Sequence, residues 1–277
     1  MTPKTARLPR ILAGFLGLAA LTISLATQAE TLRVGGTGAA LGTLRQIGAE
    51  FSRQNPSIRI EVLPYVGSTG AIKAVDAGSL DLGLSGRPAK PDEDRLDARL
   101  SAYARTPMVI AAHPSNALQS ISRDQLSALY GGRTREWGDG GRIRIILRPA
   151  HETDNDVLRL ISPEISLALD QALKRPGMTV AYTDQDAADA IESTPGAIGT
   201  STLALLRAEN RKVRILALDG IAPDVQTLAN GSYPFGKTLY LVTRRQPVPA
   251  VEALTRFIRS PQGRQIQLTN GQLPVDP

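Results

Sequence analysis

Residues 31–51 read TLRVGGTGAALGTLRQIGAEF and predict a strand, a tight turn and a helix in direct succession. Residues 32–34 have the pattern of a short strand, and glycines follow them at once. Apolar side chains then recur at the three- and four-residue spacing of one helix face, at Leu41, Leu44, Ile47 and Phe51. The segment therefore predicts the first unit of an α/β fold.

Residues 56–87 repeat this pattern twice. Beyond Pro56, apolar and charged residues alternate over residues 58–62, as in a half-buried strand. A glycine-rich turn at residues 67–70 opens a second helix, and residues 80–84 form a third short strand. Because each strand ends in a loop of small polar residues, the pattern predicts an α/β domain with a parallel sheet.

The remainder of the chain continues to alternate strands with helices. We expect strands at residues 109–112, 143–147, 197–200, 213–218 and 239–242. We expect helices at residues 126–129, 157–161, 187–191, 251–258 and 261–268, and one that begins at Pro163. Ser122 predicts a capping box with Gln125, and Ser162 predicts an N-cap.

Composition excludes several classes of protein. The chain has 277 residues, of which 42% are hydrophobic and 21% charged, so it can bury a sizeable core. It has no cysteine, which excludes disulfides, thiolate metal sites, a cysteine nucleophile and a lipid-modified cysteine anchor.

The N-terminal segment has the three regions of a secretory signal peptide. Lys4, Arg7 and Arg10 precede an apolar run at residues 11–25, and small residues lead to a cleavage site after Ala29. An uncleaved membrane anchor is the alternative, but it needs roughly 20 apolar residues. Without these three cations the formal net charge falls from +6 to +3, so we expect an exported protein that binds no nucleic acid.

Four predicted strands are followed by residues suited to holding an anion. These are Thr37-Gly38-Ala39, Gly67-Ser68-Thr69-Gly70, Ser85-Gly86-Arg87 and Arg148. Ligands of open α/β sheets bind at the carboxyl ends of strands, where helix N-termini present unpaired N–H groups. Glycines allow close approach, hydroxyls donate hydrogen bonds, and arginine offers a two-pronged contact to an oxyanion. The pattern favours an anion site, while ordinary turn chemistry explains each loop taken alone.

The ordered series of motifs resembles the phosphate-binding proteins of ABC transporters. The resemblance covers nearly the whole chain after the signal peptide. The motifs are TLRVGGTGAALGTLRQIGAEF, GSTGAIKAV, DLGLSGRP, HPSN, SISRDQLSALYGGRTREW, RIRIILRPAHETDND, PGAIGTSTL, SYPFGKTLYLV, SPQGRQI and GQLPV.

This resemblance implies an α/β, two-lobed periplasmic binding protein-like fold with a ligand cleft between the lobes. After a signal peptide at residues 1–29, lobe 1 would comprise residues 30–112 plus 220–277, and lobe 2 residues 113–219. It implies a periplasmic monomer that is not an enzyme and has no cofactor. Such a protein would capture a small oxyanion, phosphate above all, and deliver it to an ABC permease in the membrane.

The family's ligand-binding positions can be carried over one by one. Thr37, with Gly38 and Ala39 beside it, lies where the family has its first ligand-binding loop. The second and third loops and the lobe 2 arginine correspond to Ser68, Thr69, Ser85, Arg87 and Arg148.

One part of the family pattern is missing. Where the family has Ser-Gly-Thr after the arginine, this chain has Glu152, Thr153 and Asp154. Carboxylates repel a phosphate, although one of them can accept a hydrogen bond from a protonated phosphate oxygen. Alternatively, these acids face solvent or cap the helix near Val157. Both interpretations stay open, and the change predicts weaker or altered anion binding.

Three other functions are weighed against transport. A hydrolase is disfavoured because Val66 occupies the first position of the Gly-x-Ser-x-Gly elbow, and His113 and His151 are the only histidines. We therefore expect no catalytic residue. The spacing of residues 151–156 matches neither His-Glu-x-x-His nor an EF-hand loop, so we also expect no metal site. A ligand sensor or envelope interaction module with the same fold and an altered cleft remains the alternative.

Overall fold

The computed structural model describes residues 29–276. The sheet that contains the N-terminal strands has both parallel and antiparallel pairs. Strands β1 (Glu30–Gly36), β2 (Ile58–Val62) and β3 (Leu82–Ser85) are parallel, and β1 lies between the other two. Strand β10 (Gly236–Thr243) pairs with β3 in the antiparallel direction. The predicted parallel arrangement is confirmed for the first three strands, and the sheet becomes mixed because a strand from late in the chain joins it.

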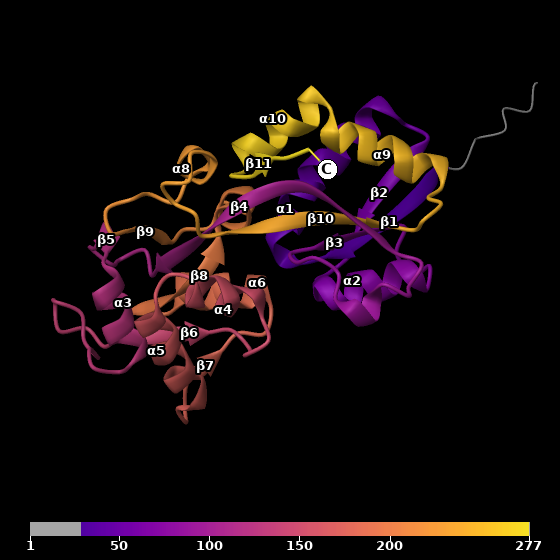
Figure 1. Cartoon of the computed structure of the whole chain (residues 1–277). Coiled ribbons are helices and arrows are strands. Elements are labelled where there is room, and N and C mark those ends of the chain that lie inside the picture. Colours follow the sequence, from indigo (N-terminus) through magenta and orange to yellow (C-terminus); the bar gives the residue numbers. More distant parts are fainter. Residues whose placement is uncertain (1–28, 277) are drawn as a thin grey trace, which may run out of the picture.

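Strand β4 (Arg99–Ala112) joins this sheet to a second one (Figure 1). Its residues 99–107 pair with β10, whereas residues 108–112 pair with β8 (Ala197–Thr202) and β9 (Arg214–Leu218). A long strand shared in this way gives the molecule two lobes. Lobe 1 is the part around β1, β2, β3 and β10, and lobe 2 is the part around β6, β7, β8 and β9.

The second sheet is also mixed. Strand β6 (Arg144–Leu147) lies parallel to β8 and to β7 (Thr179–Val180). Strand β5 (Ser120–Ile121) lies parallel to β9, whereas β11 (Leu273–Pro274) pairs with β4 at Ala104 and Arg105, in the first sheet. The division of the chain after residues 112 and 219 stays a prediction.

Helices cover both lobes (Figure 1). Those of lobe 1 are α1 (Gly38–Gln54), α2 (Gly67–Asp76), α9 (Pro249–Arg259) and α10 (Pro261–Thr269). Those of lobe 2 are α3 (Arg123–Tyr130), α4 (Thr153–Arg159), α5 (Pro163–Lys174), α6 (Asp184–Ser193) and α7 (Leu203–Ala208). The short helices η1 (Pro91–Glu93) and α8 (Val225–Ala229) lie in connections. Helices α1 and α7 contact each other across the lobe boundary.

Each lobe has its own hydrophobic core. The predicted apolar face of α1 is confirmed, because Leu41, Leu44, Ile47 and Phe51 are at most 2% exposed and pack with β1 and β3. In lobe 2, alternate residues of β6 belong to two clusters, one containing α5 and the other containing α6. Both faces of the β6 strand are therefore buried, as in other α/β folds.

Two predicted helix starts are confirmed. Ser122 accepts a hydrogen bond from the backbone N–H of Gln125, whose side chain closes the capping box. Ser162 caps α5 by accepting from Ile165 N–H, and Pro163 is the first helical residue. Local capping chemistry thus sets where these helices begin.

The predicted signal peptide lies outside the described residues except for its last position. Among residues 29–276, no helix is both long enough and apolar enough to span a bilayer.

A substitution at Gly36, the last residue of β1, tests how tightly lobe 1 is packed. This residue has φ +153, and a Cβ added to it would lie 2.0 Å from the carbonyl oxygen of Leu84. We expect Gly36→Ala to lower the free energy of unfolding by about 3 kcal/mol or more in a urea titration. Gly220→Ala is the control, because Gly220 has φ +81 with open space around it and should lose only about 1 kcal/mol. Equal losses would contradict the steric argument.

Candidate ligand-binding site

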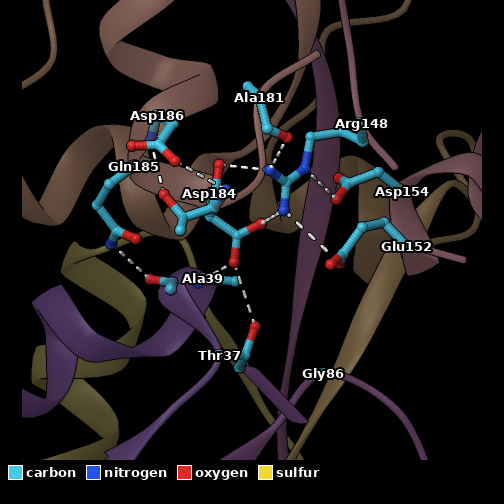
Figure 2. Close-up of polar contacts among 12 residues, drawn as sticks. Thr37, Ala39, Gly86, Arg148, Glu152, Asp154, Ala181, Asp184, Gln185 and Asp186 are labelled. Carbon is cyan, nitrogen blue, oxygen red and sulfur yellow. Dashed lines mark hydrogen bonds and ion pairs between the residues drawn. The ribbon is translucent and has the colours of Figure 1, made fainter. Parts of the chain in front are cut away.

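The loop between β1 and α1 presents a hydroxyl and a backbone N–H to lobe 2. Thr37 precedes α1, but its side chain makes no cap hydrogen bond to this helix. Its Oγ1 instead donates to Asp184 Oδ2 at 3.3 Å, and Ala39 N–H donates to the same oxygen at 3.0 Å (Figure 2). The positive end of a 17-residue helix therefore already holds a carboxylate oxygen.

The loops after β2 and β3 meet at this helix N-terminus. Ser68 Oγ accepts the Gly86 N–H at 2.9 Å, and a Cβ added to Gly86 would lie 3.4 Å from Thr37 Oγ1. The buried Ser85 hydroxyl donates to the carbonyl oxygen of Arg87 at 2.6 Å, within its own loop. Thr37 and Ser68 thus both lie close to Gly86, and Ser85 stabilises the shape of the loop.

Arg87 binds Thr69 and Glu93. The Arg87 guanidinium contacts both carboxylate oxygens of Glu93, at 2.8 and 2.7 Å, and donates to Thr69 Oγ1 at 2.8 Å. The hydrogen bonds from Arg87 lower the pKa of Glu93, which is buried. Arg87 therefore holds the β3 loop against η1, and its predicted contact with a ligand stays a prediction.

Arg148 follows β6 and is 2% exposed. Its Nη1 donates to the carbonyl oxygens of Ala181, at 2.6 Å, and of Thr183. Its Nη2 donates to Asp184 Oδ1 at 3.2 Å, while its Nε makes no hydrogen bond. We call the Thr37 hydroxyl, the Ala39 N–H and the Arg148 guanidinium together the anion cradle.

Glu152, Thr153 and Asp154 begin helix α4 next to Arg148. Glu152 is the N-cap residue, makes no side-chain cap hydrogen bond, and places Oε2 3.6 Å from Arg148 Nη2. Thr153 is the first helical residue. Asp154 is 1% exposed, with Oδ2 3.6 Å from Arg148 Nε. A solvent-facing role is therefore wrong for Asp154, whose side chain turns inward to pair with cations.

Lys237 in β10 is a site residue that the sequence did not indicate. Its Nζ lies 2.8 Å from Asp154 Oδ2, and both side chains are almost fully buried. Burial alone would lower the pKa of Lys237, but the Asp154 carboxylate outweighs it and the pKa is raised. In the same way, Lys237 and Arg148 outweigh burial and lower the pKa of Asp154. The pair is therefore charged and joins β10 to α4.

Glu152 lies in a less favourable environment. Burial, with the neighbouring Asp184 and Asp154 carboxylates, raises the pKa of Glu152 despite the attraction of Arg148. Tyr65 donates its hydroxyl to Glu152 Oε1 at 3.4 Å, and burial together with this carboxylate raises the pKa of Tyr65 to about 12. Tyr65 therefore remains protonated and is a hydrogen-bond donor near the cradle.

Asp184, the first residue of α6, was also missed. Only the apolar residues 187–191 indicated this helix, and an acidic residue in a first helical turn is normally read as a dipole contact. The structure gives it a different place, between Arg148 of lobe 2 and the α1 N-terminus of lobe 1 (Figure 2).

The charges around the cradle nearly balance. Two cations and three carboxylates lie within this cluster: Arg148, Lys237, Glu152, Asp154 and Asp184. With all five ionised, the net charge is −1. Among residues 29–276, no group of three or more metal-ligating side chains is placed to hold a metal ion. Across the two lobes, the hydrogen-bond donors of Thr37, Ala39 and Arg148 are arranged around one carboxylate, that of Asp184.

A family profile described as the PBP superfamily domain matches residues 24–262. The phosphate-binding protein PstS of Bacillus subtilis is 24% identical over 257 residues, which cover 88% of this chain and 81% of that protein.

Solved structures share the fold. A putative phosphate ABC transporter substrate-binding protein from Clostridium perfringens, with bound phosphate, superposes with a TM-score of 0.74 and 16% identity. This alignment covers 89% of this chain and 100% of the other. The BenM effector binding domain with its effector benzoate has a TM-score of 0.51 and 16% identity, with 86% and 92% coverage. The fold therefore occurs with a phosphate and with a carboxylate.

The buried Lys237–Asp154 pair generates a stability prediction. Lys237→Met removes one partner and leaves a buried carboxylate, so we expect the free energy of unfolding to fall by about 3–5 kcal/mol in a urea titration. Adding Asp154→Leu should recover part of that loss, because no unpaired charge then remains at the pair.

The exposed pair Arg256–Glu252 provides the matched control. Arg256→Met should change stability by less than about 1 kcal/mol. Strictly additive losses in the double variant at residues 154 and 237 would show that the two side chains are not energetically paired.

Proposed function

The chain belongs to the PBP superfamily, and we propose that it captures a small oxyanion, phosphate above all, for an ABC-type importer. The observation that carries the proposal is the bridging carboxylate of Asp184. One of its oxygens accepts from Ala39 N–H in lobe 1, and the other accepts from Arg148 in lobe 2. Phosphate presents oxygens in several directions and fits the same donors.

The donor chemistry supports an oxyanion over a neutral solute. A helix N-terminus favours negative charge, and a buried guanidinium requires an anionic partner. The hydroxyls of Thr37, which precedes α1, and of Ser68, in the first turn of α2, both lie near Gly86 and add donors that suit either phosphate or sulfate. Contacts from both lobes exist together only in the closed state, so a ligand held by both stabilises closure.

The names of the relatives support transport over sensing. The curated relatives and several structural neighbours are named as phosphate-binding or phosphate-transport proteins. By this analogy the protein is non-catalytic, works in the periplasm as a monomer after removal of residues 1–29, and delivers phosphate to a membrane permease. The proposed function involves no binding of nucleic acid.

A ligand sensor or envelope interaction module is the second candidate. The observation in its favour is the set of three carboxylates around Arg148, since each of them repels a phosphate dianion. If Glu152 or Asp154 instead accepts a hydrogen bond from protonated phosphate, the carboxylates are compatible with capture.

Phosphate titration of a Thr37 variant tests the proposal. We expect wild-type protein, freed of co-purified ligand by unfolding and refolding, to bind phosphate near one per chain in isothermal calorimetry. Thr37→Val removes one hydroxyl donor to the anion, so its Kd should rise about tenfold or more.

Thr43→Val is the matched control, because Thr43 lies within α1, the helix that Thr37 precedes, and its buried hydroxyl has no hydrogen-bond partner. Its phosphate Kd should equal that of the wild type. Absence of phosphate binding to folded wild-type protein, or an equal change in both variants, would contradict the proposed site.

A further inference from the structure

The carboxylate of Asp184 makes the contacts expected of a ligand. Its Oδ2 accepts from Ala39 N–H at 3.0 Å and from Thr37 Oγ1 at 3.3 Å, whereas its Oδ1 accepts from Arg148 at 3.2 Å. Figure 2 shows this carboxylate between the guanidinium and the α1 N-terminus. The anion cradle therefore already contains an anion that belongs to the chain itself.

The first turn of α1 is shaped to admit this side chain. A Cβ added to Gly38 would lie 2.7 Å from the Asp184 Cβ and 2.8 Å from its Oδ2. Any larger residue at position 38 would thus collide with the docked carboxylate. The absence of a side chain at Gly38 allows α6 of lobe 2 to approach α1 of lobe 1.

The neighbouring residue strengthens this docking. Gln185 Nε2 donates to the carbonyl oxygen of Gly38 at 3.3 Å and to Glu209 Oε1 at 2.9 Å. Two successive residues of α6 therefore contact the first turn of α1 across the lobe boundary. These contacts hold the lobes together as a bound ligand would.

We propose that Asp184 is an affinity-determining residue that occupies the anion cradle in the ligand-free protein, closes the lobes, and must be displaced before phosphate binds. This inference rests on the proposed function for the identity of the ligand. Displacement follows from charge: with its five side chains ionised, the cluster at Arg148 has net charge −1, and a phosphate beside all three carboxylates would face strong repulsion. Removing Asp184 from the cradle frees its three donors for phosphate.

Asp184→Asn tests the inference with little change in shape. A carboxylate accepts with both oxygens, whereas an amide turns N–H hydrogens toward either Arg148 or the α1 N-terminus. We expect the ligand-free variant to open, with a larger radius of gyration than wild type by small-angle X-ray scattering. We also expect its phosphate Kd in calorimetry to be about tenfold or more lower than that of wild type.

Asp186→Asn is the matched control. It makes the same chemical change two residues along α6, where the carboxylate accepts from the Thr183 N–H in the capping box of this helix and makes no hydrogen bond to Thr37, Ala39 or Arg148. This variant should match wild type both in radius of gyration and in phosphate Kd. Both measurements use the protein purified after export.

The outcomes separate the inference from the proposed function. An open Asp184→Asn protein that binds phosphate more tightly supports both. An open variant, with no phosphate binding to any of the proteins, supports occupation of the cradle by Asp184 and overturns phosphate as the ligand. A variant as closed as wild type overturns the inference, whatever the phosphate result. Weaker or unchanged phosphate binding by an open variant would show that Asp184 does not compete with phosphate for the anion cradle.

Discussion

A buried guanidinium must have partners for its charge, and the anion cradle of this protein is organised around that requirement at Arg148. The side chain is 2% exposed, so water cannot supply these partners. Two backbone carbonyls accept hydrogen bonds from one side of it, and three carboxylates surround the rest. Ligand binding therefore depends on which anion completes this environment.

The same electrostatic requirement links the two lobes. Arg148 lies in lobe 2, but Asp154 beside it also pairs with Lys237 from β10, and Asp184 reaches the α1 N-terminus in lobe 1. These contacts therefore connect residues of both lobes around Arg148. A neutral or cationic ligand cannot replace the carboxylate partners of Arg148 without leaving a buried ion unpaired.

Much of the fold and part of the site could be predicted from the sequence, because they depend on local patterns. The helix face from Leu41 to Phe51 and the caps at Ser122 and Ser162 are set by nearby residues. Lys237 and Asp184 could not be found in this way, since their partners lie 83 and 36 residues away in the chain. The mixed sheet escaped prediction for the same reason: β10 joins from the far end of the chain.

A crystal structure of the protein grown with saturating phosphate is the most direct test of the anion cradle. We predict phosphate within hydrogen-bonding distance of the Ala39 N–H, the Thr37 hydroxyl and the Arg148 guanidinium, with the Asp184 carboxylate moved out of the cradle. A structure in which Asp184 keeps its contacts with Ala39 and Arg148, while phosphate is bound elsewhere or is absent, would contradict this assignment.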